Sequence, residues 1–342
     1  MPHLGACLLV LVTAGTVTLA ALQTVAEQRD AVPPGAVHAI TAERLMATVK
    51  ALAAPEMEGR RTGTAGGHKA RSWLVSAIEE TGLSAIGSDY VLPFRFRSRN
   101  GEQTEGANIA ATCPGADPSL PVIVVSAHYD HLGVRDGQIY PGADDNASGV
   151  ATVLELARRC RRLPFQHTTF FVFFDAEEQG LQGARAFVSS PPIPRERLTL
   201  NVNLDMVARG DAGELYVSGL RHYPSLRGAL EPVAARSNVR LLFGHDQATA
   251  GADDWTFQSD HGAFHEAKIP FVYFGVEDHA DYHKPTDAPE KIDPVFFQRA
   301  AETILDALMA LDRQLASRSG RPPSAFCFLC FVLIQPNPAF RT

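Results

Sequence analysis

Four apolar runs carry the main structural signal in this sequence. They are continuous instead of alternating, and they cover Pro121 to Ala127, Thr168 to Phe174, Leu198 to Leu204 and Ile269 to Phe274. Strands that are covered on both faces have this pattern, and such strands are typical of parallel sheets in α/β proteins. The runs therefore predict a buried, mostly parallel central sheet.

Helical patterns lie around and between these runs. From Thr41 to Ala54 apolar residues recur on one helical face, and Thr41 suits an N-cap. A second periodic stretch ends at Gly82, a natural C-cap, and further helices are predicted over Val150 to Leu163 and Pro294 to Leu315. The pattern predicts an α/β fold with a mixed, mostly parallel central sheet and helices on both faces, in one domain over residues 38–318.

A glycine-rich loop runs from Gly59 to Gly67 and raises the question of phosphate binding. A phosphate-binding loop of this kind follows a strand and ends in Gly-Lys-Ser/Thr, and neither feature is present here. We therefore interpret the loop as a plain connector.

Both ends of the chain differ from the predicted domain. Leu4 to Leu22 is almost continuously apolar, so residues 1–26 are predicted to be a signal peptide or an N-terminal anchor, although a basic segment before the run is missing. If it stays uncleaved, the run is long enough to span a bilayer, which takes about 20 residues. Residues 319–342 form an atypical apolar tail in which Cys327 and Cys330 lie, and its role stays open.

Composition narrows the function classes. The chain has 342 residues, 45% of them hydrophobic and 20% charged, which is ordinary for a globular enzyme and argues against disorder. Its net charge of -7 argues against a protein that neutralises nucleic-acid phosphates. Five cysteines, one of them in the N-terminal run, imply no disulfide framework.

Residues of metal-ligand type follow the apolar runs. His128 and Asp130 follow the first, Glu177 and Glu178 the second, and Asp205 the third. The carboxyl ends of strands in an open α/β sheet face one crevice, so we expect these side chains to converge. Each residue alone is more simply explained as solvated surface, but charged groups directly after buried strands rarely lack a partner.

These residue types suit a two-metal hydrolytic centre. Zinc binds His nitrogens and carboxylate oxygens, and a bridging carboxylate can hold two ions close together. In His128-Tyr-Asp130 the two polar side chains project to the same side of an extended chain, so Asp130 can orient His128. Glu177 and Glu178 diverge, which leaves one free to handle a proton.

The chain resembles the di-zinc aminopeptidase family that also includes glutamate carboxypeptidase type II, transferrin receptor and glutaminyl cyclase. The segments that carry the resemblance are Ala127-His-Tyr-Asp-His131, Pro141-Gly-Ala-Asp-Asp-Asn-Ala-Ser-Gly149, Asp175-Ala-Glu-Glu-Gln-Gly-Leu181, Asn203-Leu-Asp-Met206, Ser259-Asp-His261 and Tyr282-His283. They follow the family order over nearly the whole predicted domain. The resemblance implies a zinc exopeptidase architecture.

The resemblance also implies a ligand set. Asp145 would bridge two Zn²⁺ ions per chain and precede a cis peptide bond. Glu178 and His283 would complete one zinc site, and His128 and Asp205 the other.

Other roles follow from the same resemblance. Glu177 would be the general acid/base, Asp130 the partner of His128, and Tyr282 a hydrogen-bond donor to the developing oxyanion. We interpret the remaining histidines of these segments as loop residues or as supports of the ligands: His131, His261 and His279.

The apolar N-terminal run predicts export, to the periplasm or the extracellular space. The resemblance implies a hydrolase that removes the N-terminal residue from peptides by a hydroxide held between two metals. The segment Ile269 to Gly275 has no arginine to grip a substrate carboxylate, which favours peptides with a free N-terminal amine. Two alternatives stay open: glutaminyl cyclase-like acyl transfer, and a non-catalytic receptor-like module. Membrane contact is expected only with an uncleaved N-terminal segment.

Overall fold

The computed structural model describes residues 39–98, 100–162, 165–247, 251 and 253–318. The predicted signal or anchor and the apolar tail lie outside these residues. The described residues from Ile40 to Arg318 form one compact unit. In the part that is described, no helix is long and apolar enough to cross a membrane.

A sheet of nine strands forms the centre of this unit, in the order β1-β3-β7-β4-β8-β11-β9-β10, with β2 paired to β3. Its four middle strands, β7, β4, β8 and β11, are parallel to one another, and β10 is parallel to β9. The remaining pairings are antiparallel. A mixed sheet with a parallel centre is what the continuous apolar runs predict.

The strands of the sheet are β1 Ser84–Ala85, β2 Val91–Arg97, β3 Gln103–Cys113, β4 Val122–His128, β7 Thr169–Phe174, β8 Leu198–Leu204, β9 Glu214–Ser218, β10 Arg240–Phe243 and β11 Phe271–Gly275. A separate two-stranded ribbon pairs β5 Gly133–Arg135 with β6 Gln138–Tyr140. The predicted runs agree with β4, β7 and β8 within a residue at each end, and β11 begins two residues later than Ile269.

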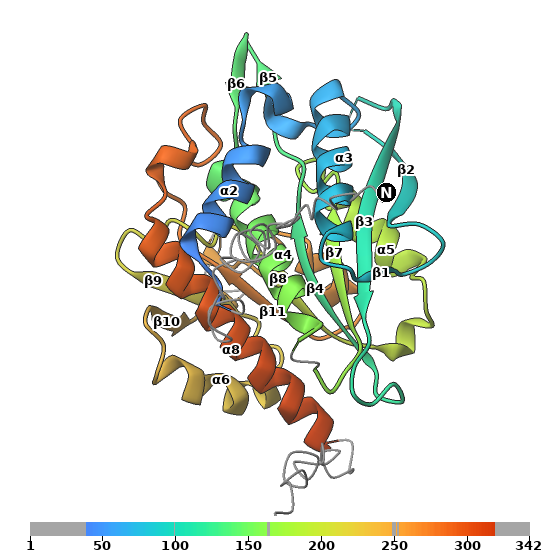
Figure 1. Cartoon of the computed structure of the whole chain (residues 1–342), viewed down its shortest axis with the longest axis vertical. Helices are drawn as coiled ribbons and strands as arrows, with labels where there is room; N and C mark the ends of the chain where they lie inside the picture. The colour runs from blue at the N-terminus through green and yellow to red at the C-terminus, as the bar shows by residue number, and fades with distance from the viewer. Residues whose placement is uncertain (1–38, 99, 163–164, 248–250, 252, 319–342) are drawn as a thin grey trace, which may run out of the picture. The chain divides into compact units, whose positions relative to one another are not determined.

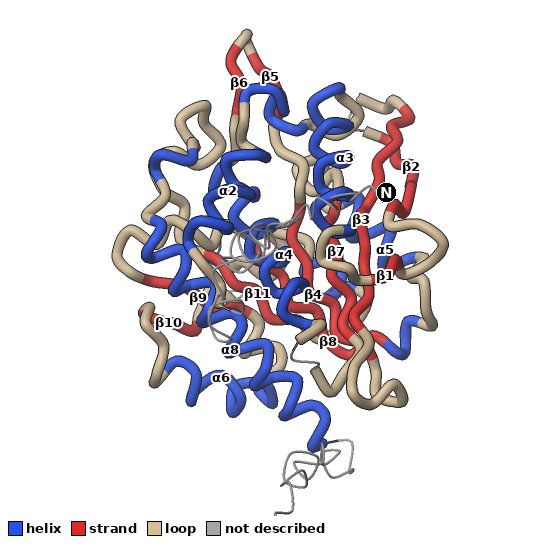
Figure 2. Tube along the Cα trace, viewed as in Figure 1, coloured by secondary structure: helices blue, strands red, loops and turns tan. Residues whose placement is uncertain are grey.

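Helices cover both faces of the sheet. One face packs against α2 Ala42–Leu52, α3 Ala65–Glu79, α4 Gly149–Cys160, α6 Arg227–Ala234 and α8 Pro294–Arg318. The other packs against α5 Gln182–Ser189 and α7 His261–Glu266. Figure 1 shows α2, α4 and α8 in front of the strands, and Figure 2 shows the red strands running side by side behind them. Short helical turns are η2 Pro55–Arg60, η3 Ala143–Ser148, η4 Arg195–Arg197, η5 Pro224–Leu226 and η7 Pro289–Lys291.

The continuous apolar runs fill two cores at once. In β4, Ile123 and Val125 contribute to the core under α2 and α4, while Val122 and Val124 contribute to the core under α5 and α7. Successive side chains of a strand point to opposite faces, so a strand covered on both sides needs apolar residues at every position.

The helix ends largely follow their sequence signals. Thr41 caps α2 by accepting a hydrogen bond from the Arg44 backbone N–H at 3.4 Å, and Gly82 follows α3 with φ of +70°. However, α4 ends at Cys160, three residues before the predicted Leu163, and α8 continues to Arg318.

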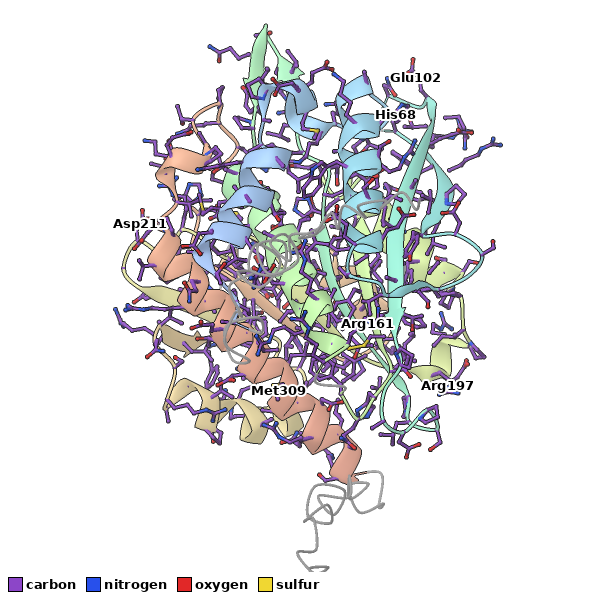
Figure 3. The ribbon with its side chains drawn as sticks, viewed as in Figure 1. His68, Glu102, Arg161, Arg197, Asp211 and Met309 are labelled. Carbon is purple, nitrogen blue, oxygen red and sulfur yellow. A yellow bond between two sulfur atoms is a disulfide. The ribbon has the colours of Figure 1, made fainter. Side chains whose placement is uncertain are left out.

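A disulfide joins Cys113, the last residue of β3, to Cys160, the last residue of α4. The sequence analysis did not foresee this bond, because the two cysteines are 47 positions apart and only the fold brings them together. Arg161, labelled in Figure 3, follows the bonded Cys160 and donates to the carbonyl of Gly82 at 3.0 Å.

We expect the double variant Cys113→Ala/Cys160→Ala to lose about 2–4 kcal/mol of unfolding free energy, because the bond removes chain entropy from the unfolded state. Denaturant unfolding of the wild type with and without reductant, beside the variant, measures this loss. Reductant should lower the wild-type stability to that of the variant and leave the variant unchanged. Equal stability of the three samples would contradict the prediction.

Candidate metal centre

Predicted ligands meet at the carboxyl ends of the parallel strands. His128 ends β4, Asp205 directly follows β8, and Glu178 follows β7 by four residues. Asp145 lies in η3, before α4, and His283 lies in the loop between β11 and α8. All five line one cavity of about 420 Å³. The sheet therefore brings together residues that are up to 155 positions apart in the sequence (283 − 128).

Two groups of ligand atoms share Asp145. In the first, His128 Nε2 lies 3.3 Å from Asp145 Oδ1 and 3.2 Å from Asp205 Oδ1. In the second, His283 Nε2 lies 3.1 Å from Asp145 Oδ2 and 3.5 Å from Glu178 Oε2. Asp145 thus turns one carboxylate oxygen to each group.

These separations fit metal ligation. Ligand atoms that bind one zinc tetrahedrally at about 2.0–2.1 Å lie about 3.3 Å from one another. The four N···O distances scatter around this value, and the two oxygens of Asp145 are placed as in a carboxylate that bridges two ions. The residues therefore fit a pair of zinc ions.

The adjacent Asp144 takes a different role. Its Oδ1 accepts a hydrogen bond from the Ala208 backbone N–H at 2.8 Å, and its Oδ2 lies 3.3 Å from His279 Nε2. The backbone N–H groups of both aspartates donate to Asp287 at 3.1 Å, which fixes the turn. The peptide bond after Asp145 is cis, as the resemblance implies.

Arg60 holds the backbone around the ligands. Its guanidinium is completely buried and donates to the carbonyls of Tyr129 and Gly142 at 2.9 Å and of Leu52 at 2.8 Å. Burial lowers the pKa of Arg60 to about 10, so the group keeps its charge at neutral pH. Sequence reasoning missed this residue, because nothing local marks an arginine in a glycine-rich loop as buried.

Asp130 contacts both His128 and Glu177. Asp130 Oδ1 accepts the Glu177 backbone N–H at 3.0 Å, and its Oδ2 accepts the Thr62 hydroxyl at 3.3 Å. His128 Nδ1 lies 3.1 Å from the carbonyl oxygen of Asp130 but 3.8 Å from its carboxylate. Asp130 therefore contacts His128 mainly through its backbone, while its side chain positions Glu177.

His131 belongs to the centre and was not among the predicted ligands. Its ring is buried, and its Nδ1 lies 2.7 Å from Glu178 Oε1 and 3.7 Å from Asp145 Oδ2. Together these three residues form a group that could hold a metal ion. The sign of this role in the sequence is that His131 follows His128 by three residues, directly beyond the end of β4.

Three other residues that the sequence analysis singled out are Tyr282, His279 and His261. Tyr282 lines the cavity and stacks on His283 with ring centroids 3.9 Å apart. His279 pairs with Asp144, and His261 is buried with its Nε2 at 2.8 Å from the carbonyl of Trp255. The structure thus places His279 and His261 away from the two ligand groups.

The acids and histidines of the centre shift one another's pKa values. Burial alone would raise the pKa of Asp145, but His131, His128 and His283 hold it well below its usual range. Burial opposes protonation of His283, yet hydrogen bonds to Asp145 and Glu178 raise its pKa to about 10. The buried carboxylates therefore attract positive charge strongly, as either protons or metal ions.

Comparisons with known proteins agree with this geometry. The chain is 32% identical to the aminopeptidase YwaD of Bacillus subtilis over 196 residues, which are 55% of this chain and 40% of that protein. It is 29% identical to the BOS complex subunit NCLN of Canis lupus familiaris over 237 residues, covering 63% and 41%. The chain thus spans about 40% of the length of these curated relatives.

Among solved structures, the aminopeptidase from Aneurinibacillus sp. strain AM-1 matches with a TM-score of 0.64 at 19% identity, covering 79% of this chain and 93% of that one. The fold is therefore that of zinc exopeptidases. The family model described as Peptidase family M28 matches residues 108–308, which hold the whole centre and more than half of the sequence. The chain belongs to peptidase family M28.

Proposed function

We propose that this protein is a two-zinc aminopeptidase that hydrolyses the first peptide bond of substrates with a free N-terminal amine. The observation that carries the proposal is the placement of the two Asp145 oxygens at ligand separations from two different His and carboxylate sets. Aminopeptidases among the relatives support it. A complex subunit is also among them, so family membership alone does not fix the activity.

Zinc ions held by His128, Asp205, Asp145, Glu178 and His283 would supply a water of lowered pKa and stabilise negative charge on the carbonyl oxygen of the substrate. The chain's own groups position this site, because Arg60 and Asp287 fix the backbone around the ligands. His131 would support the second ion from the side of Glu178.

Glu177 is our candidate for proton transfer. It lines the cavity beside the ligands without contributing to either ligand group. Burial raises the pKa of its carboxyl well above the usual range, and the charges of Asp260 and Asp205 add to the shift. Such a group can accept the proton of the attacking water and return it to the leaving amine. Asp130 holds the backbone of Glu177 in position for this.

Tyr282 is our candidate for binding the oxyanion. Its ring is held against His283, and it lines the same cavity as the candidate ligands. Burial raises the pKa of the phenol, and the nearby Asp145 and Asp205 raise it further, so the hydroxyl keeps the proton that it would donate.

The cavity favours a positively charged substrate end. Besides the metal ligands, the carboxylates of Glu177 and Asp278 face it, and these attract an α-ammonium group. Its apolar wall, made by Met206, Trp255 and Phe257, suits an apolar side chain on the first residue. Two alternatives are less well supported. Glutaminyl cyclase-like chemistry needs one metal, whereas this chain retains both ligand sets. A receptor-like module needs neither ligand set.

We also propose that the protein acts outside the cytoplasm, in the periplasm or extracellular space. The apolar N-terminal run supports this, and so does the disulfide between Cys113 and Cys160, because such bonds persist in oxidising compartments.

We expect Glu177→Gln to lower kcat for aminoacyl amides by about 10²–10⁴-fold while the bound zinc stays at the wild-type level, because the variant loses only the proton-transfer group. Steady-state kinetics with metal analysis of the same samples measures both. The matched control is Glu196→Gln, an exposed carboxylate before β8, which should keep wild-type activity. Near-normal hydrolysis by Glu177→Gln, or cyclisation of an N-terminal Gln peptide without hydrolysis of free-amine substrates, would contradict the assignment.

We expect zinc binding at pH 7 to release protons. The pKa of His283 is about 10, so its ring is protonated in the metal-free chain and must lose a proton before it can bind metal. Calorimetric titration with zinc in buffers of different ionisation enthalpy measures the number released. His283→Ala should release fewer protons and bind less zinc. Binding heats that are independent of the buffer would show that the prediction is wrong.

A further inference from the structure

A second cavity, of about 260 Å³, lies beside the metal centre. Leu132, Arg135 and Glu178 line both cavities, so the two adjoin. The second cavity is bordered by Arg61 of the glycine-rich loop, by the β5–β6 ribbon and by the turn between β2 and β3. Figure 1 shows the ribbon at the top of the molecule, and Figure 3 labels Glu102 of that turn at the same end.

Two arginines give this cavity its charge. Arg61 and Arg135 both line it, both are exposed, and neither forms a salt bridge with a carboxylate in the part of the chain that the structure describes. Other arginines of this protein have such partners, for example Arg95 with Glu105 at 2.7 Å and Arg185 with Glu266 at 2.5 Å. Two guanidinium groups without a carboxylate partner thus line one cavity, which Glu178 also lines.

Arg61 is held at its base. The buried side chain of its neighbour Arg60 fixes the loop, and the Arg61 carbonyl accepts hydrogen bonds from the backbone N–H of Thr64 at 3.1 Å and from its hydroxyl at 2.7 Å. Gly133 packs directly against the Arg61 side chain. A Cβ at Gly133, where φ is +82°, would lie 2.7 Å from Arg61 Cβ, so this close approach requires glycine.

Arg135 is held by the ribbon. It pairs with Gln138 across the two strands, and its guanidinium carbon lies 5.5 Å from the centre of the Tyr140 ring. A cation stacked over an aromatic ring loses part of its freedom before a ligand arrives, which lowers the entropy cost of binding.

The remaining walls suit the same ligand. Asn100 and Gln179 offer amide groups, and Ser98 a hydroxyl. Guanidinium groups bind carboxylates through paired parallel hydrogen bonds, so two arginines with nearby amides form a carboxylate site.

We propose that this cavity binds a carboxylate on the leaving part of the peptide substrate, and that Arg61 and Arg135 are therefore specificity-determining residues. The inference rests on the proposed aminopeptidase function. The two ends of the substrate would then be sorted by charge, with the ammonium group at the acidic metal cavity and the carboxylate at the arginines. The carboxylate is either the C-terminus of a short peptide or an acidic side chain.

The test compares matched acids and amides. Leu-Gly, Leu-Gly-Gly and Leu-Gly-Gly-Gly are each assayed with a free C-terminus and as the C-terminal amide. Each residue adds about 3.3–3.6 Å of reach, so the series finds the length at which the carboxylate arrives at the arginines. Leu-Asp-amide and Leu-Gly-Asp-amide place a side-chain carboxylate at two positions instead.

For the wild type we expect at least one length at which kcat/KM is about tenfold higher for the acid than for the amide, mainly through KM, with a smaller ratio at high salt. In Arg61→Gln/Arg135→Gln this ratio should fall to about one. Gly133→Ala, which displaces Arg61, should lower it as well. The control is Arg195→Gln, an exposed arginine at the amino end of β8, which should keep the wild-type ratio.

The outcomes separate the two proposals. If the wild type hydrolyses free-amine substrates but shows no preference for a carboxylate in either the length series or the Asp-containing amides, or if the double variant keeps the preference while folded by its melting curve, the carboxylate site is wrong and the aminopeptidase stands. If no free-amine substrate is hydrolysed by the zinc-loaded protein, the proposed function fails and this inference falls with it. A preference only for the Asp-containing amides identifies the acidic side chain as the ligand.

Discussion

The burial of several carboxylates at one point is the constraint on which the rest of the structure depends. Asp130 and Asp205 are buried just beyond the ends of β4 and β8, Asp145 is buried in η3 before α4, and Glu178 is nearly buried. Unpaired charges in such a place are strongly unfavourable, so the fold must supply positive charge around them. Arg60 and three histidines, His128, His131 and His283, supply part of this positive charge. Metal ions bound by the same carboxylates would supply the rest.

The backbone between the ligands is held by side chains and not by regular secondary structure. Arg60 donates to the carbonyls of Leu52 at the end of α2, of Tyr129 and of Gly142, and Asp287 accepts N–H groups from the turn of Asp145. The Asn146 amide donates to the carbonyl of Leu204 at 2.9 Å, which ties that turn to the end of β8. These bonds fix the backbone that carries the ligands, and such preorganisation is what catalysis by fixed groups requires.

The sequence predicted those parts of the fold and site that have local signals. Continuous apolar runs located β4, β7 and β8, and polar residues directly after them located His128, Glu178 and Asp205. The parts that it missed depend on distant contacts. Cys113 meets Cys160 only after β3 and α4 have packed, and His131 could not be distinguished from an ordinary loop histidine until Glu178 was placed beside it. The roles of Asp130 and Asp144 likewise depend on bonds to backbone groups, which leave no pattern in the sequence.

The glycine-rich loop contributes more to the site than its sequence indicates. The sequence analysis interpreted this loop as a plain connector, but in the structure it places two arginines at two different sites. It turns Arg60 into the interior to bind the ligand loops, and it turns the adjacent Arg61 outward to the second cavity. Gly59 permits this because a Cβ there would lie 2.5 Å from the carbonyl oxygens of Gly133 and Tyr140. The close approach of Gly59 to these two carbonyls therefore shapes the loop that directs Arg60 to the metal centre and Arg61 to the second cavity.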